Sequence, residues 1–101
     1  MIIYNITTQV SWNIHNQWRQ WMLDSHLPSL FSTGVFSHYQ LVRLLEVDED
    51  FGPTYALQLY VEEQHSIEEY KRCHQQQIQD QEAQMWGDEA YSFASIMQVI
   101  N

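Results

Sequence analysis

The chain has 101 residues, of which 45% are hydrophobic and 14% aromatic, and this composition is that of one folded domain rather than of a disordered segment. Thirteen acidic residues against four basic ones give a formal net charge of −9 at pH 7. Because phosphate backbones and anionic membrane surfaces would repel such an acidic protein, we expect neither nucleic acid nor a membrane as a partner.

The first expected element is a β-strand over residues 2–10, where apolar and polar residues alternate and β-branched side chains are frequent. A helix should follow, capped by Ser11 or Asn13, whose side-chain oxygens can accept a bond from an unpaired first-turn amide. One face of this helix carries apolar residues at helical spacing: Ile14, Trp18, Trp21 and Met22. Pro28 disfavours helical geometry in the residue before it, so the helix should end or kink near His26, with a further turn after Pro28.

The middle of the sequence predicts two paired strands. Residues 35–47 have the pattern of a long strand with apolar residues on both faces, and residues 54–62 form a second alternating run. The polar, turn-rich segment 48–53 has the length of a hairpin connection, so the two strands should pair directly. Arg43, in the middle of the first of them, should pair with an acidic residue or bind a ligand carboxylate.

A second helix and a last strand complete the pattern. Residues 66–69 (Ser-Ile-Glu-Glu) match a capping box, in which the Ser hydroxyl and a Glu carboxylate each bond an end amide, and Gly87 can end the helix. This helix should be long, with few apolar positions and a solvated run of glutamines. Residues 89–100 should form the closing strand.

The order strand, helix, strand, strand, helix, strand predicts a single α+β domain over residues 1–101 with the ferredoxin-like βαββαβ topology. In that fold a four-stranded antiparallel sheet carries two helices on one face and leaves the other face open. Since the strands are apolar on both faces, a second copy should cover the open face, which predicts a homodimer packed sheet against sheet.

Four motifs of the chain resemble those of a known family: Met1-Ile2-Ile3-Tyr4-Asn5, Trp18-x-x-Trp21-Met22, His26-Leu27-Pro28 with Thr33-Gly34-x-Phe36, and Tyr55-Ala56-Leu57-Gln58. They resemble the uncharacterised family called domain-of-unknown-function 4286 over nearly the whole chain. The resemblance implies the dimeric α/β-barrel superfamily, in which ferredoxin-like protomers pack sheet against sheet and each keeps a pocket between its sheet and helices. Relatives by fold include monooxygenases, ring-cleaving or isomerising enzymes, haem-degrading proteins and stress-induced proteins, so the fold alone does not select a function.

In several such groups a His-x-Pro segment near the end of the first helix lines the pocket, and His26-x-Pro28 is similar to it. The Asn-Trp-His pocket set of the monooxygenases has no clear counterpart here, which weakens that comparison. With a near-neutral reference pKa, a histidine is the best general acid or base in the chain. A histidine at a helix C-terminus is also stabilised by the helix dipole without any chemistry, so both roles for His26 stay open.

The candidate ligand-contacting residues form a set of five: Trp18, Met22, His26, Tyr39 and Gln58. Tryptophans at helical spacing and tyrosines in strands are also typical of core or interface positions. Gln58, like Asn5, would need a partner on a covered face, which fits dimer pairing and ligand contact equally well.

The sequence contains no pattern that predicts a metal or cofactor. The histidines lack metal-ligand spacing, and neither a Ser-His-Asp pattern nor a glycine-rich phosphate loop is present. Cys73, the single cysteine, cannot form an internal disulfide and is expected to be a buried, inert thiol. With no basic, apolar leader at residues 1–18, these features favour the cytoplasm.

Three functions remain open. The first is a binding module that holds a small, largely apolar or aromatic molecule between the sheet and the first helix, with His26 as a polar contact. The second is a cofactor-independent monooxygenase or isomerase, where His26 removes a proton and a tyrosine or Gln58 stabilises the oxyanion. The third is a stress or interaction protein without a ligand site.

Overall fold

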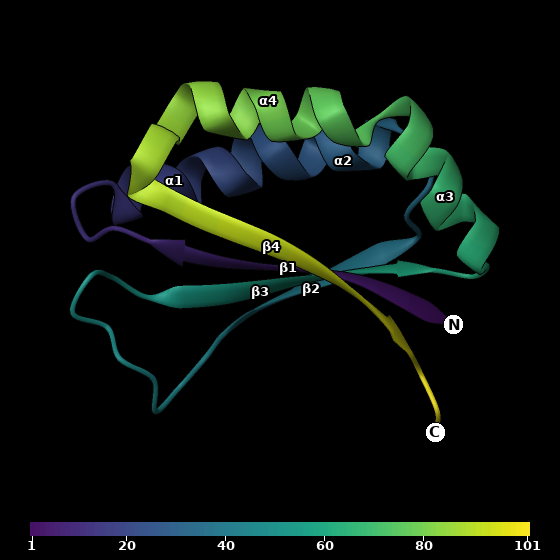
Figure 1. Ribbon diagram of the computed structural model, residues 1–101, viewed down its shortest axis with the longest axis horizontal. Helices are drawn as coiled ribbons and strands as arrows, with labels where there is room; N and C mark the ends of the chain where they lie inside the picture. Colours follow the sequence, from purple (N-terminus) through teal and green to yellow (C-terminus); the bar gives the residue numbers. More distant parts are fainter.

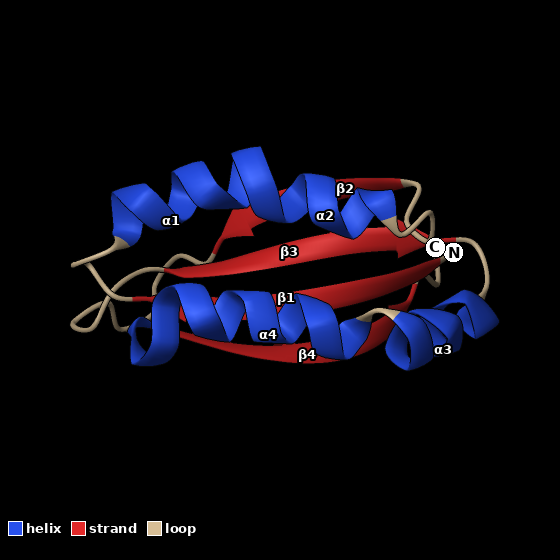
Figure 2. Cartoon of the chain, turned by 90° about the horizontal axis from the view of Figure 1, so that it is seen from above, coloured by secondary structure: helices blue, strands red, loops and turns tan.

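Four antiparallel strands lie side by side in the order β2–β3–β1–β4 in the computed structural model, which describes residues 1–101 (Figure 1). The strands are β1 (Ile2–Val10), β2 (His38–Arg43), β3 (Thr54–Val61) and β4 (Ala90–Gln98). The helical segments are α1 (His15–Trp21), a π-helical segment (Met22–His26), α2 (Leu27–Ser32), α3 (Gln64–Cys73), α4 (Gln75–Trp86) and a 3-10 turn (Gly87–Glu89). All helices cover one face of the sheet (Figure 2), which confirms the predicted βαββαβ fold.

The register of the sheet decides which side chains meet the helices. Tyr4 lies opposite Leu59, and the next residue, Asn5, lies opposite Gln58. The Tyr4 ring contacts Tyr70 of α3, with the ring centroids 5.3 Å apart. Because successive side chains of a strand point to opposite faces, Tyr4 and Leu59 face the helices, whereas Asn5 and Gln58 face away from them.

The core fills the space between the sheet and the helices. Its large, fully buried side chains come from both layers: Tyr4, Val10, Trp18, Leu30, Leu57, Leu59, Val61, Ile67 and Tyr70. The apolar face predicted for the first helix is part of this core, since Trp18 and Met22 are buried there. Because strands and helices contribute together, each element depends on the others for its buried surface.

The first helical stretch continues through Pro28 instead of ending before it. The residue before the proline, Leu27, keeps helical dihedrals (φ −60°, ψ −47°), and the irregularity takes the form of the π-helical segment Met22–His26. Proline has no amide hydrogen and its ring crowds the carbonyl four residues earlier, so a wider turn at this point relieves the conflict. The hydroxyl of Ser11 accepts a bond from the amide of Asn13, whereas no side chain caps α1 itself.

The second helical stretch departs from the expectation at two points. The predicted capping box is wrong: α3 begins at Gln64, after an extended Glu63, and Ser66 lies within its first turn. The single long helix is also wrong, because His74 (φ −131°, ψ −29°) separates α3 from α4. The break lets both helices place a buried face against the sheet, and this packing overrides the local capping signal. Gly87 ends α4 with a positive φ of 55°, as predicted.

The strand predicted over residues 35–47 is shorter in the structure, because only His38–Arg43 pairs with β3. Beyond it, Glu46 has a positive φ of 60°, and the chain leaves the sheet in a loop over residues 44–53. The Arg43 guanidinium donates to both carboxylate oxygens of Glu49 in this loop, with contacts of 2.8 to 3.1 Å. The indole N–H of Trp12 also donates to the backbone carbonyl of Glu49 at 2.8 Å, which ties the loop to the end of β1.

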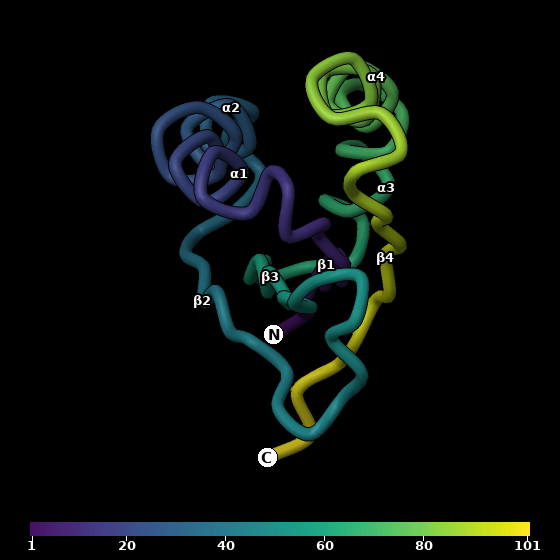
Figure 3. Tube along the Cα trace, turned by 90° about the vertical axis from the view of Figure 1, so that its left-hand side faces the viewer, coloured from purple at the N-terminus to yellow at the C-terminus, as the bar shows by residue number.

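The face of the sheet opposite the helices carries no helix. Figure 3 shows both the loop 44–53 and the C-terminal end of β4 projecting on this side. Tyr91 and Phe93 of β4 are 56% and 64% exposed. Cys73, expected to be buried, is exposed at the end of α3. None of the helices combines the length and the apolar character needed to cross a membrane.

Candidate functional site

A cavity of about 50 Å³ lies between the sheet and the helices. Residues from β1, the π-helical segment, α3, α4 and β4 surround it, among them Tyr4, His26, Tyr70, Glu82 and Ser92. Most of the remaining wall is apolar, as expected for a small-molecule site. The cavity is much smaller than the roughly 300–1,000 Å³ typical of sites for drug-sized ligands, so only a small molecule fits without movement.

His26 reaches this cavity from the π-helical segment and is only 3% exposed. Its imidazole stacks on the indole of Trp21, with ring centroids 4.4 Å apart. Burial lowers the pKa of His26 to about 4, so the ring is neutral at physiological pH. Its Nδ1 atom is buried and has no hydrogen-bond partner. An unpartnered buried nitrogen is costly in a core, because it loses its hydrogen bonds to water without gaining one from the protein.

Glu82 of α4 faces His26 across the cavity wall. Its Oε2 atom lies 4.0 Å from Nε2 of His26, beyond hydrogen-bond distance. The Oε1 atom accepts a bond of 2.6 Å from the hydroxyl of Ser92. Burial raises the pKa of Glu82, and the hydrogen bond from Ser92 opposes this shift in part.

A third polar side chain extends this network to the centre of the sheet. The hydroxyls of Thr8 and Ser92 lie 2.7 Å apart. Because the only hydroxyl proton of Ser92 goes to Glu82, Thr8 must donate to Ser92. The resulting chain of donors, Thr8 to Ser92 to Glu82, links β1, β4 and α4 and ends on a carboxylate.

Two phenols complete the polar groups of the cavity. The hydroxyl of Tyr4 accepts a bond of 2.7 Å from the side-chain amide of Gln75. Burial raises the pKa of Tyr4 and, more strongly, that of Tyr70. Both phenols therefore keep their protons at neutral pH, and the hydroxyl of Tyr4 still has its proton to donate.

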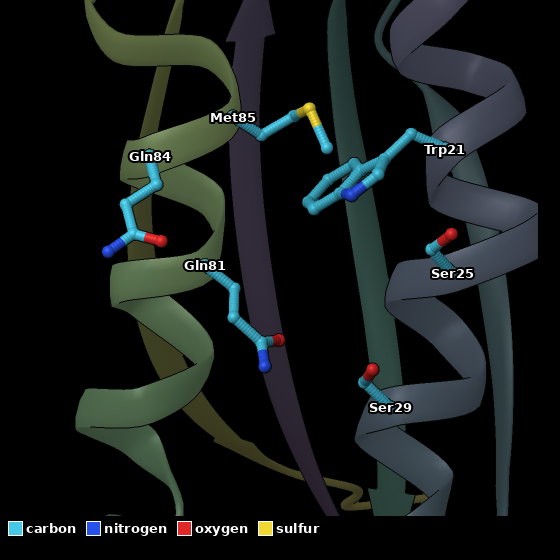
Figure 4. A pocket seen from close by; sticks show the side chains of 6 residues that line it. All are labelled: Trp21, Ser25, Ser29, Gln81, Gln84 and Met85. Carbon is cyan, nitrogen blue, oxygen red and sulfur yellow. The ribbon is translucent and has the colours of Figure 1, made fainter.

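The cavity reaches the surface between α4 and β4. Gln79, Glu82 and Ser92 line the cavity and also an open groove of about 310 Å³ at this edge. A second groove, of about 440 Å³, runs between the first helical stretch and α4, where Trp21 and Met85 point toward one another (Figure 4). The Trp21 ring stacks on His26, so it lies between this second groove and the cavity.

The structure brings one of the five predicted ligand contacts, His26, to the cavity. Trp18 is 1% exposed and stacks on Tyr55, while Met22 is packed in the core. Tyr39 lies on the edge strand β2, where its ring contacts Phe31. Gln58 lies on the opposite face of the sheet from Tyr4 and the cavity.

Sequence reasoning missed Thr8, Glu82 and Ser92. Glu82 belongs to the helix whose run of glutamines is predicted to form a solvated face, but it follows the buried Ile78 by four residues and so shares the face of Ile78. That spacing was the available signal for Glu82. No signal in the sequence joins residues 8, 82 and 92, because they meet only when the sheet and α4 assemble. No three His, Cys, Asp or Glu side chains gather closely enough to hold a metal ion.

Comparison with known sequences assigns the chain at the level of a family. The family model described as "Domain of unknown function (DUF4286)" matches residues 1–100. No curated protein matches the sequence significantly. The family match covers all four strands and every residue of the cavity, so the site lies within the matched region.

Several solved structures share the fold at low sequence identity. An "ethyl tert-butyl ether d (ethd) family protein" from Bacillus halodurans has a TM-score of 0.70 at 12% identity, covering 99% of this chain and 100% of that one. A mutant of MhuD with two manganese protoporphyrin IX molecules bound per active site has a TM-score of 0.70 at 11% identity, covering 100% and 96%. A dimeric ferredoxin-like protein from an uncultured marine organism has a TM-score of 0.61 at 8% identity, covering 99% and 96%. At these identities the likeness establishes the ferredoxin-like fold alone.

Proposed function

The chain belongs to the DUF4286 family, and from that premise we propose that it binds a small, largely apolar or aromatic molecule in the cavity beside His26. The observation that supports the proposal is the cavity itself, which lies between sheet and helices and places His26 and Glu82 among mostly apolar and aromatic side chains. The same cavity argues against the third reading, an interaction protein without a site.

A ligand larger than a few atoms requires the cavity to expand. The shared lining of the cavity and the outer groove supports expansion between α4 and β4, where Glu82 and Ser92 stand at the junction. β4 is an edge strand that pairs only with β1. Moving α4 away from this edge therefore breaks no pairing within the sheet, although it strains the bond between Ser92 and Glu82.

A binding experiment with a small aromatic probe tests the proposal. Benzyl alcohol, titrated into the protein and followed by NMR, should shift the signals of His26 and Tyr70. Ala94→Leu, which adds volume at the cavity wall, should weaken binding by about tenfold or more, whereas Ala94→Ser should change it little. Native mass spectrometry of the purified protein should show any molecule that co-purifies. Absence of any saturable shift in the native protein would exclude the site.

The pairing of His26 with Glu82 favours a second function, a cofactor-independent monooxygenase or isomerase. A neutral imidazole 4.0 Å from a carboxylate can accept a proton from an activated carbon and be stabilised as it does so. The phenols of Tyr4 and Tyr70 border the cavity and can serve as oxyanion donors, in place of the Gln58 considered from the sequence.

Proton abstraction can be measured without knowing the substrate. The protein should accelerate solvent deuterium exchange at the acidic carbon of 2-indanone, and His26→Gln should slow that exchange by about 100-fold. His65→Gln is the matched control, because His65 is exposed on α3. Equal rates for His26→Gln and the native protein would remove His26 as the base and leave the binding function standing.

We also propose that the protein acts as a homodimer packed through its open sheet face, in the cytoplasm. Exposed Tyr91 and Phe93 on the helix-free side support the dimer, as does the dimeric description of one structural neighbour. The exposed, free thiol of Cys73 agrees with a reducing compartment.

A further inference from the structure

Resting on the proposed binding site, we propose that its ligand is a protonated amine on a small aromatic or apolar body, held by Glu82 and the rings of Tyr4 and Tyr70. The inference depends on which groups line the cavity: a carboxylate and two tyrosines, with no basic side chain. Three independent observations lead to it.

First, the carboxylate of Glu82 offers the cavity an acceptor that no donor of the protein fills. Oε2 of Glu82 lies 4.0 Å from Nε2 of His26, which is too far for a hydrogen bond. Since Nε2 is the ring nitrogen nearer the carboxylate, the neutral ring is best placed with its proton there. A ligand that satisfies Oε2 of Glu82 must bring an N–H or O–H donor.

Second, the hydrogen-bond chain behind Glu82 is built for a negative charge. Thr8 donates to Ser92, and Ser92 donates to Oε1 of Glu82, so both protons point toward the carboxylate. Such a chain stabilises an anion at its end. A cationic ligand would complete the arrangement, and the neutral imidazole of His26 would not repel it.

Third, the protein has no basic side chain at the cavity. Arg43 is engaged with Glu49 in the loop, and the other three basic residues, Arg19, Lys71 and Arg72, are exposed. A carboxylate or phosphate ligand would meet no cation there, and the net charge of −9 would oppose its approach. An ammonium group would instead be attracted by the carboxylate of Glu82 and by the electron-rich rings of Tyr4 and Tyr70, which also line the cavity.

Three probes of equal size separate the chemistry of the head group from simple cavity filling: benzylammonium, benzyl alcohol and benzoate. Titrated into the native protein at pH 7 and followed by NMR at His26 and Tyr70, benzylammonium should bind about tenfold more tightly than benzyl alcohol. Benzoate should bind more weakly than either. Equal affinities for ammonium and alcohol, or a preference for benzoate, would overturn the inference while leaving the proposed site intact. Failure of all three probes would overturn the proposed site itself.

A variant that removes the carboxylate tests whether Glu82 causes the preference for benzylammonium over benzyl alcohol. Glu82→Gln should bring the affinity for benzylammonium down to that for benzyl alcohol and leave the alcohol unchanged. Glu68→Gln on the exposed side of α3 changes the net charge by the same amount and should keep the full preference. A preference that persists in Glu82→Gln, or is lost equally in Glu68→Gln, would contradict the assignment. Should Glu82→Gln fold poorly, the comparison of the three probes in the native protein still decides the inference.

Discussion

At the scale of the single residue, His26 is the side chain with the most unusual environment. Its ring is 3% exposed, and no titratable group other than Glu82 lies within reach of it as an ion-pair partner. The pKa of the folded-state imidazole, about 4, lies below its ordinary value of 6.5. The unfolded chain therefore binds more protons than the folded protein between these two pH values.

This difference predicts a pH dependence that belongs to His26. Because folding lowers the pKa of His26, the contribution of the neutral imidazole to the free energy of unfolding is full above pH 6.5. This contribution is lost as the pH falls toward 4. The loss amounts to about 3 kcal/mol of the free energy of unfolding. His26→Gln should remove this pH dependence, because glutamine does not titrate, whatever constant change in stability accompanies the substitution. Urea unfolding between pH 4 and 7 measures it, and parallel curves for the two proteins would contradict the buried, neutral state.

A second residue-scale prediction concerns Gly52 in the loop 44–53. A Cβ there would lie 1.6 Å from the carbonyl oxygen of Val10, a backbone atom that cannot move aside alone. Gly52→Ala should lower the free energy of unfolding by about 3 kcal/mol or more. Gly34→Ala is the comparison, since Gly34 has free space around it and only a positive φ of 76°, worth about 1 kcal/mol. Chemical denaturation should rank the two variants in this order, and the reverse order would show that the loop relaxes freely.

At the scale of the element, α4 is attached to the sheet by apolar and polar contacts on one face. Ile78 is its buried apolar residue, and Glu82, one turn later, bonds to Ser92 of β4. The opposite face is rich in exposed glutamines. A helix attached along one face can move outward as a unit, and this is the motion that the proposed ligand binding between α4 and β4 requires.

Removing the polar attachment tests this description of α4. Ser92→Ala removes the partner of both Oε1 of Glu82 and the hydroxyl of Thr8, which should cost about 1 kcal/mol of stability because Ser92 is exposed and water can replace its bonds. Amide hydrogen exchange should become faster in α4, while α1 keeps its protection. Ser95→Ala, on the other face of the same strand, should change neither quantity. Uniform acceleration across all helices would indicate global destabilisation rather than a local release.

At the scale of the whole molecule, the two faces of the sheet differ. Helices bury one face, whereas the other carries exposed aromatic side chains of β4 beside the projecting loop 44–53 (Figure 3). Phe51 of that loop contacts Tyr91, with ring centroids 5.5 Å apart, so the loop and β4 meet on this side. An apolar patch with this position is typical of an association surface.

The proposed dimer predicts a mass of twice 12.1 kDa in native mass spectrometry and light scattering. Phe93→Glu places a charge on the open face and should shift the protein to the monomer, because buried unpaired charge is costly. Tyr39→Glu is the control, since Tyr39 is also exposed but lies on the helix-facing side of β2. A native protein that stays monomeric at high concentration would rule out the dimer.

Sequence alone determined the order of the elements, the bounds of β1, the end of α4 at Gly87 and membership of a family. The order and bounds of the elements depend on local periodicity and on backbone preferences, which neighbouring residues encode directly. The family membership rests instead on the resemblance of the motifs and on the family model that matches residues 1–100. Tertiary structure alone decided where β2 ends, why the second helical stretch breaks at His74, and which residues surround the cavity. Thr8, Glu82 and Ser92 are separated by most of the chain, and they meet His26 only because the strand register and α4 bring them together. A site built from long-range contacts has no local signature, since packing selects its members after the elements have formed.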